Sequence, residues 1–245
     1  MLRILKKMPY LKQQIYFIII KTFVKTHIYK VLSLPARFFD SINQMTYFSK
    51  WIAQNPIEFS NFDGWKRGSA QKFHEHVFTY ENLSEPIDFF EFGVAKGESF
   101  RWWVEMNTHE DSHFWGFDTF VGLPEDWHFM KKGTFSTDGH FPSINDKRVT
   151  FIKGLFQESL PLFLHGKQFK HRKVFHLDAD LFSSTLVVLT QLFPHIKAGD
   201  ILIFDELKDV RHEFRAFKLF TESFYLKYQV LGGINNFCQV AIKIL

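Results

Sequence analysis

The chain has 245 residues, of which 46% are hydrophobic and 23% charged, so it is long enough for one α/β domain with an N-terminal extension. Its single cysteine, Cys238, cannot form an internal disulfide, which argues against a secreted fold held by disulfide bridges. Residues 1–50 hold nine Lys or Arg and one acid, a charge of +8 against +4 for the whole chain, so the rest of the chain is net acidic. A basic domain that binds nucleic acid is therefore not expected.

Residues 1–50 are predicted to be helical, because apolar residues recur at helical spacing with lysines between them. The longest uninterrupted apolar run covers residues 15–20, whereas a helix that spans a membrane needs about 20 apolar residues. No small-residue cleavage site follows this run, so a signal peptide is not expected and the protein is placed in the cytoplasm. Two interpretations stay open: the helix lies on the inner face of an anionic membrane, or it packs on the rest of the chain or on a second subunit in a homodimer.

The pattern changes at about Pro86, where short apolar runs begin to alternate with helical stretches. Such alternation predicts an α/β fold, a mostly parallel sheet with helices on both faces. We therefore divide the chain into a helical extension, residues 1–85, and an α/β domain, residues 86–245, with a helix over 65–83 leading into it. Residues 119–147 form an irregular stretch long enough to suggest a functional loop. The predicted strands are Ile87–Phe92, His113–Phe117, Val149–Lys153, Lys173–Leu177, Ile201–Phe204, Tyr228–Leu231 and Phe237–Ile244.

A turn with glycine at both ends, Gly93 and Gly97, follows the first predicted strand and leads into a helix that begins at Ser99. Glycines let the backbone approach a ligand closely, and a helix N-terminus presents free N–H groups. The spacing Gly-x-x-x-Gly differs from the Gly-x-Gly-x-x-Gly of a dinucleotide site, which disfavours NAD and FAD. Glu91 ends the strand and can pair with the amino group of a methionine-type moiety; the alternative is a solvated charge.

Asp118 ends the second predicted strand, 25 residues after Gly93. An acid at this place can accept hydrogen bonds from both hydroxyls of a ribose. The position therefore supports an adenosine cofactor, which fits either S-adenosylmethionine or NAD. The predicted cofactor-binding residues are Glu91, Gly93, Gly97, Ser99 and Asp118.

Three further acids end the next two predicted strands: Asp178 follows the fourth, and Asp205 and Glu206 follow the fifth. Ligands in open α/β sheets bind at the carboxyl ends of the strands, so these carboxylates are expected to meet at one edge. Without a partner they would repel one another, which suggests a hard divalent cation such as Mg²⁺. Asp180 is expected instead to cap the helix that begins near Ser183.

Together these motifs resemble the macrocin O-methyltransferase (TylF-like) family of class I S-adenosylmethionine-dependent methyltransferases. The resemblance implies a seven-stranded Rossmann-like sheet, a Mg²⁺ site and methylation of a sugar hydroxyl. By position, Asp178, Asp205 and Glu206 match the metal ligands, although the family commonly has a second Asp where this chain has Glu206. The matching stretches, in order within about residues 87–217, are 91–99, 116–124, 153–161, 176–185 and 199–206.

The resemblance leaves the general base open. Catechol-type relatives carry a lysine three residues after the fourth-strand Asp, where this chain has Leu181. Asp178 or a loop histidine, His140 first, is therefore expected to take the proton. The acceptor is expected to be a sugar of a polysaccharide, a glycolipid or a secondary metabolite. The alternative is a catalytically silent domain that binds the cofactor or a partner and is recruited to membranes by the basic helix.

Overall fold

A computed structural model describes residues 2–55, 60–61 and 69–245. By its internal contacts the chain divides into two compact units, one that ends at Tyr47 and one that runs from Phe48 to Leu245. The first unit consists of helix α1 (Leu2–Thr26) and most of helix α2 (Tyr29–Gln54), in agreement with the predicted helical N-terminus. None of the described helices is long and apolar enough to cross a membrane.

The division at residue 85 followed the change in sequence pattern, whereas the contacts divide the chain at Tyr47. The end of α2 belongs to the second unit because Trp51 packs on Phe214 and Phe217 and donates a hydrogen bond from Nε1 to Tyr228 Oη, at 2.8 Å. A separate N-terminal domain up to residue 85 therefore stays a proposal. Of the helix predicted over 65–83, residues 65–68 lie outside the described residues and α3 covers Ser69–Tyr80.

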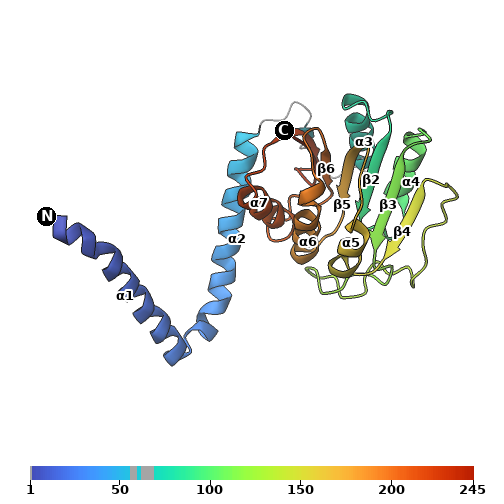
Figure 1. Cartoon of the computed structure of the whole chain (residues 1–245). Coiled ribbons are helices and arrows are strands. Elements are labelled where there is room, and N and C mark those ends of the chain that lie inside the picture. Colours follow the sequence, from blue (N-terminus) through green and yellow to red (C-terminus); the bar gives the residue numbers. More distant parts are fainter. Residues whose placement is uncertain (1, 56–59, 62–68) are drawn as a thin grey trace. The chain divides into compact units, whose positions relative to one another are not determined.

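The described part of the second unit forms one eight-stranded sheet with the order β1-β7-β8-β6-β5-β2-β3-β4 (Figure 1). The seven predicted strands are all present, and a two-residue strand, β1, adds to the edge beside β7. All neighbouring strands are parallel except β8, which runs antiparallel to β6 and β7. The strands are β1 (Ser60–Asn61), β2 (Ile87–Phe92), β3 (His113–Asp118), β4 (Val149–Lys153), β5 (Arg172–Leu177), β6 (Ile201–Phe204), β7 (Tyr228–Ile234) and β8 (Gln239–Ile244).

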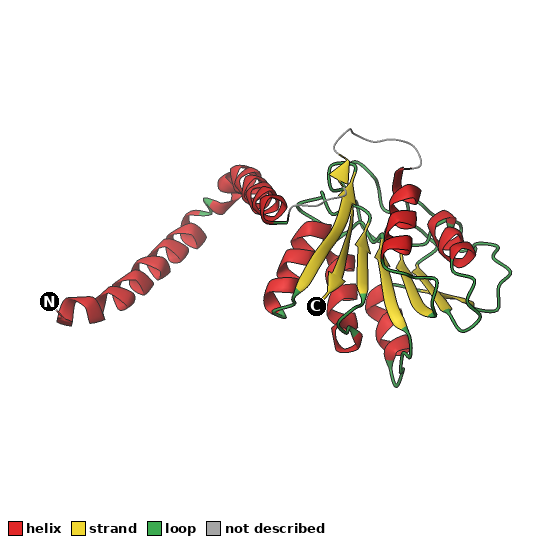
Figure 2. Cartoon of the chain, turned by 90° about the horizontal axis from the view of Figure 1, so that it is seen from above, coloured by secondary structure: helices red, strands yellow, loops and turns green. Residues whose placement is uncertain are grey.

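Helices cover both faces of this sheet, as the alternating pattern predicted (Figure 2). Helices α3 and α4 (Glu98–Met106) pack on one face, where their apolar side chains share a cluster with those of the strands. Helices α5 (Phe156–Leu164), α6 (Phe182–Leu192) and α7 (Glu213–Ser223) pack on the other face. A short 3₁₀ helix, η1 (Phe193–His195), follows α6.

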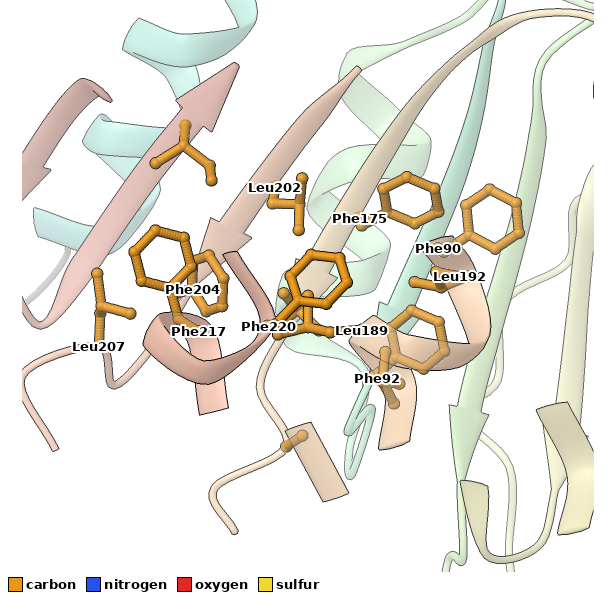
Figure 3. Close-up of a cluster of buried hydrophobic side chains, with 14 of the residues drawn as sticks. Phe90, Phe92, Phe175, Leu189, Leu192, Leu202, Phe204, Leu207, Phe217 and Phe220 are labelled. Carbon is orange, nitrogen blue, oxygen red and sulfur yellow. The ribbon is translucent and has the colours of Figure 1, made fainter. Parts of the chain in front are cut away.

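Phenylalanine fills much of the core between these layers. Successive residues of a strand point to opposite faces, so Phe90 and Phe92 of β2 join one cluster while Phe89 joins the other. Figure 3 shows the first of these clusters, where Phe90 and Phe92 lie with Phe217 and Phe220 of α7. Each fully buried Phe side chain contributes about 1.5–3 kcal/mol to folding. Of the 32 phenylalanines of the chain, 16 are buried among the described residues and therefore have a structural use as an aromatic core.

The last two strands differ from their predicted bounds. β7 continues to Ile234, whereas the sequence pattern predicted its end at residue 231. β8 begins at Gln239, whereas the pattern predicted its start at residue 237. Between them Asn235, Asn236 and Phe237 have positive φ angles of 51°, 58° and 60° and form the turn. Asparagine tolerates this left-handed conformation. Phe237 is apolar, so the sequence pattern assigned it to the strand although it lies in the turn.

The strand order places a crevice at the centre of the sheet. From β2 the chain continues to β3 and β4 on one side, and from β5 it continues to β6 on the other. In doubly wound folds ligands bind at the carboxyl ends of the strands where the order reverses. In this chain that place lies between the ends of β2 and β5.

Candidate active site

A cavity of about 350 Å³ opens at the carboxyl edge of the sheet. This volume is in the range of small-molecule and cofactor sites. The wall is built from residues that end or follow β2, β3, β5 and β6, together with the start of α5 and part of the loop 119–147. Of the predicted site residues, the lining includes Gly93, Asp118, Asp178, Asp205 and Glu206.

The two glycines of the turn after β2 are required by the packing of the protein itself. Gly93 has a φ of +96°, and a Cβ there would lie 1.8 Å from the backbone oxygen of Asp178. Gly97 has a φ of +75°, and a Cβ there would lie 2.7 Å from Pro142. The turn can therefore pass against the end of β5 only without a side chain at position 93. The predicted close approach is real, but at both positions the neighbour is protein, and Gly97 is not among the lining residues.

Asp118 joins two walls of the cavity. Its Oδ2 accepts hydrogen bonds from the backbone N–H groups of Val94 (2.8 Å) and Ala95 (2.7 Å), and its Oδ1 accepts one from Phe120 N (2.6 Å). A carboxylate has about four acceptor positions, and these three bonds leave one on Oδ1 for a ligand. Asp118 therefore holds the turn after β2 beside the loop after β3 and can also accept a hydroxyl group.

Three carboxylates converge in the cavity as predicted. Asp178, Asp205 and Glu206 each offer an oxygen atom, and these atoms lie within 4.8 Å of one another. Burial raises the pKa of Asp178 well above its usual range, and the charge of Asp205 raises it further. Glu206 Oε2 is buried without a hydrogen-bond partner among the described residues. Three close acids with an orphaned oxygen fit a bound divalent cation, because oxygen ligands of this kind are those that Mg²⁺ takes.

Glu213 is a fourth acid beside this trio that the sequence analysis did not select. Its side chain is fully buried at the start of α7, and its Oε2 accepts a hydrogen bond from Glu206 N at 3.0 Å. Burial raises its pKa well above the usual range, and Asp205 adds to the shift. Glu213 orients the backbone at the end of β6 and adds a fourth acidic group to those that a cation would neutralise. No local pattern indicated this place, because turns separate Glu206 from the start of α7.

Asp180 lines the cavity and does not cap α6 as expected. The N-cap of α6 is Leu181, and no side chain makes a capping hydrogen bond there. Asp180 has a φ of +56°, which is uncommon for a residue with a side chain. Burial and the charges of Asp205 and Asp209 raise its pKa to about 7. The left-handed turn directs the chain so that this carboxylate faces the cavity, two residues after Asp178.

Glu91 and Ser99 lie behind the cavity wall. Glu91 is 1% exposed and is not among the lining residues; its Oε2 accepts a hydrogen bond from Ser99 Oγ at 3.2 Å. The neighbouring residue in β5, His176, places its Nδ1 3.4 Å from the same oxygen. Burial lowers the pKa of His176, but Glu91 and the charge of Asp205 together raise it more, so the net shift is upward. The direct contact of Glu91 with a cofactor amino group stays a prediction without support from this geometry.

The His176 ring continues this buried polar group toward α3. His74 of α3 lies against it, with ring centroids 5.0 Å apart, and burial lowers the pKa of His74 well below its usual value. Neither histidine was predicted as a site residue. The signal was available in the strand alternation, because His176 shares a face of the sheet with Glu91 when the two strands are neighbours.

The loop 119–147 contributes Trp127 to the wall and is tied to the chain after β6 by Asp209. Asp209 Oδ2 accepts a hydrogen bond from Trp127 Nε1 at 3.2 Å and lies 2.5 Å from His128 Nε2. His128, Asp209 and His212 are close enough to hold a metal ion. However, His128 Nδ1 accepts from Arg211 and His212 Nδ1 accepts from Phe182 N, so both rings keep their proton on Nε2. These hydrogen bonds therefore fix the loop 119–147 to the chain after β6.

His140 lies in the same loop but is not among the residues that line the cavity. It is exposed, and its Nδ1 is 3.0 Å from the carbonyl oxygen of Thr137. The structure thus brings Asp178 and Asp180 to the cavity and leaves the predicted loop histidine outside its wall.

The sequence model of the macrocin-O-methyltransferase (TylF) family matches residues 66–239 of this chain. The structure of the calicheamicin methyltransferase CalS11 is similar, with a TM-score of 0.60, 20% identity and coverage of 73% of this chain and 80% of CalS11. The O-methyltransferase NovP is similar with a TM-score of 0.54, 20% identity and coverage of 69% and 79%. At such identities these structures show a shared fold. None of the curated protein sequences matches the chain significantly.

Proposed function

Because this chain belongs to the macrocin-O-methyltransferase (TylF) family, we propose that it is a Mg²⁺-dependent enzyme that transfers a methyl group from S-adenosylmethionine to a sugar hydroxyl. The observation that carries the proposal is the meeting of Asp118 with Asp178, Asp205 and Glu206 in one cavity at the carboxyl edge of the sheet. The first residue suits the adenosine of the cofactor, and the other three suit the metal.

The cofactor is proposed to lie along the turn after β2. Asp118 Oδ1 accepts a ribose hydroxyl, and the backbone at Gly93 and Ala95 forms the adjoining wall. The buried Glu91, hydrogen-bonded to Ser99, fixes the start of α4 from behind. On this proposal Ser99 and Gly97 position the cofactor site by holding the helix N-terminus in place.

Asp178, Asp205 and Glu206 are proposed to hold Mg²⁺. A bound Mg²⁺ ion supplies a positive charge that polarises neighbouring hydroxyl groups and lowers their pKa. Asp205 is fixed for this purpose by Gln239, whose Nε2 lies 3.2 Å from Asp205 Oδ1. Glu206 has the longer side chain where the family commonly has Asp, and its unpaired Oε2 is the atom most in need of a cation.

We propose that Asp180 receives the proton, because it lines the cavity two residues after Asp178 and is not assigned to the metal. Asp178, the other carboxylate expected as the base, is assigned to the metal. The acceptor hydroxyl gives its proton to a carboxylate as its oxygen forms a bond to the methyl carbon. The carbon–sulfur bond breaks, and S-adenosylhomocysteine is the second product. The buried Leu181 occupies the position at which catechol-type relatives carry a lysine, so no lysine is available there as the base. Holding the two reactants in line accounts for much of the rate in such reactions.

The acceptor is proposed to be a sugar of a polysaccharide, a glycolipid or a secondary metabolite. One similar structure is that of CalS11, described as a TDP-rhamnose 3'-O-methyltransferase, with a TM-score of 0.53 and 20% identity. In this chain Trp127 offers an aromatic wall to the cavity, which suits the apolar face of a sugar ring. The reaction is assigned to the cytoplasm. For the basic N-terminal helices, a bilayer surface and a second subunit are the two partners that the sequence leaves open.

Calorimetry with S-adenosylmethionine, with and without MgCl₂, tests the cofactor and the metal. We expect wild type to bind both, and Asp178→Ala to lose Mg²⁺ binding while it retains the cofactor. Absence of cofactor binding in both conditions would favour a silent domain and refute the enzyme. Mg²⁺ affinity that is equal in wild type and Asp178→Ala would refute the metal site.

Turnover with TDP-rhamnose as the first trial acceptor separates Asp180 from the loop histidine His140 as the base. Asp180→Asn is expected to lower kcat by about 10²–10⁴-fold, the usual contribution of a general base. His140→Ala is the matched variant and is expected to retain kcat. The opposite result would restore the loop histidine as the base and remove Asp180 from that role.

A further inference from the structure

The first unit presents an unusual number of large apolar side chains at its surface. In α1 all six residues from Ile15 to Ile20 are between 42% and 66% exposed. In the part of α2 that belongs to this unit, Phe38 and Phe39 are 63% and 66% exposed. Soluble proteins rarely leave large apolar patches without a partner, so this surface calls for an occupant.

One apolar row and one pair of lysines lie on different sides of α1, while Lys12, three residues before Ile15, lies on the side of the apolar row and Phe17, two residues after it, lies on the side of the lysines. Ile15, Ile19 and Phe23 follow one another at intervals of four and therefore share a face. Lys21 and Lys25 share another face, and each stands two residues after a member of the apolar row. Two residues correspond to a rotation of about 200°, so the lysines lie opposite the apolar row.

The charge of this segment selects among the occupants. Residues 1–39 contain eight Lys or Arg and no acid, and the first acid is Asp40. A second copy of the helix would bring further cations and no compensating acids to the flanks, where paired helices usually have complementary charges. An anionic bilayer supplies both an apolar phase for the isoleucines and negative headgroups for the lysines.

We propose that residues 2–47 bind the surface of an anionic lipid bilayer, with α1 lying in the plane of the interface. The helix lies on the membrane and does not cross it, because no described helix meets the length and apolarity of a span. On the proposed function, this binding brings the methyltransferase to sugars that are carried on lipids.

The test uses the full-length protein and vesicles of two compositions, phosphatidylcholine alone and phosphatidylcholine mixed with phosphatidylglycerol. Co-sedimentation is expected with the anionic vesicles, to weaken in high salt, and to be much lower with the neutral ones. Because each basic residue near such a surface strengthens binding about fivefold, the double variant Lys21→Glu, Lys25→Glu is expected to bind at least about twentyfold more weakly.

A matched control changes the same charge elsewhere. Lys170→Glu with Lys227→Glu alters two exposed lysines of the second unit and is expected to leave vesicle binding unchanged. The variant Ile19→Gln, Phe23→Gln removes part of the apolar row and is expected to weaken binding at least about tenfold. Circular dichroism and S-adenosylmethionine affinity show whether each variant is folded.

Two results would overturn the proposal. Equal binding to neutral and anionic vesicles would remove the role of charge. Absence of vesicle binding, together with a dimer in light scattering that Ile19→Gln, Phe23→Gln dissociates, would assign the apolar row to a second copy of the chain. Neither result depends on turnover, so failure of the membrane proposal and failure of the proposed enzyme activity are distinguishable.

Discussion

At the amino ends of the parallel strands, buried acids have basic partners. Lys173 Nζ, at the start of β5, lies 3.0 Å from Asp200 Oδ2, and the two side chains are 2% and 3% exposed. Glu81 is paired with both Arg172 and Lys243. Burial raises the pKa of Glu81, but these two partners lower it more, so the net shift is downward. At this edge of the sheet, ion pairs neutralise the buried acids and connect neighbouring parts of the chain.

At the carboxyl ends of the same strands, acids collect without such partners. Among the described residues, no Lys or Arg forms an ion pair with Asp178, Asp205, Glu206 or Glu213. Two oxygens, Glu206 Oε2 and Glu213 Oε1, are buried without a partner in the described part of the chain. The comparison shows that this chain can pair a buried charge where stability requires it. The unpaired acids at the other edge are then best explained by a ligand.

Replacement of the basic residue Lys173 at the amino edge should have the largest effect on stability. Lys173→Met leaves Asp200 buried without its charge partner and is expected to lower the free energy of unfolding by about 3–5 kcal/mol. Urea denaturation measures the change, with the exposed Lys170→Met as the control. The affinity of the folded variant for S-adenosylmethionine should stay that of wild type. A loss below about 1 kcal/mol would show that this pair is not what stabilises the amino edge.

Removal of an acid at the carboxyl edge should act in the opposite direction on stability. Glu206→Gln relieves repulsion by Asp178 and Asp205, so the protein in EDTA is expected to gain about 1–2 kcal/mol in its free energy of unfolding. Mg²⁺ affinity, measured by calorimetry, should fall by about a hundredfold or more. A variant that loses stability in EDTA and retains Mg²⁺ affinity would contradict the contrast between the two edges.

Asp209 sharpens the comparison, because it is an acid of the carboxyl edge that does have partners. Asp209→Ala removes the hydrogen bond from Trp127 and the contact with His128, and is expected to raise amide exchange in loop 119–147 about tenfold. Hydrogen exchange followed by mass spectrometry measures this, with S-adenosylmethionine affinity unchanged. The control is Asp126→Asn in the same loop, an exposed pair with Lys131. Equal exchange in both variants would show that Asp209 does not hold the loop.

The sequence predicts the strands and the acids that end them, because both depend on local pattern. A short apolar run followed by Asp or Glu gives the position of Asp118, Asp178 and Asp205 once the strands are parallel. The parallel arrangement brings these residues to one edge whatever the details of packing. For this reason the fold class and the meeting of Asp178, Asp205 and Glu206 followed from the sequence and from the family resemblance.

Side-chain direction after a strand could not be predicted in the same way. Glu91, the last residue but one of β2, points into the protein, where Ser99 Oγ donates a hydrogen bond to it and His176 lies beside it. Asp180 instead turns toward the cavity through a positive φ angle. Neither outcome follows from residue type or spacing. The contacts of Asp209 with Trp127 and His128 join residues more than 80 positions apart in the sequence, and no local pattern predicts them.

Gly93 has a consequence for comparison and redesign of related chains. A glycine kept at this position across relatives would ordinarily be interpreted as a mark of the cofactor, yet the atom that excludes a Cβ here is the main-chain oxygen of Asp178. The constraint at position 93 therefore arises from the packing of β2 against β5, before any ligand is bound. We expect a library that varies this residue to alter cofactor preference to return unfolded protein, so the loop residues around Trp127 are the better positions to vary.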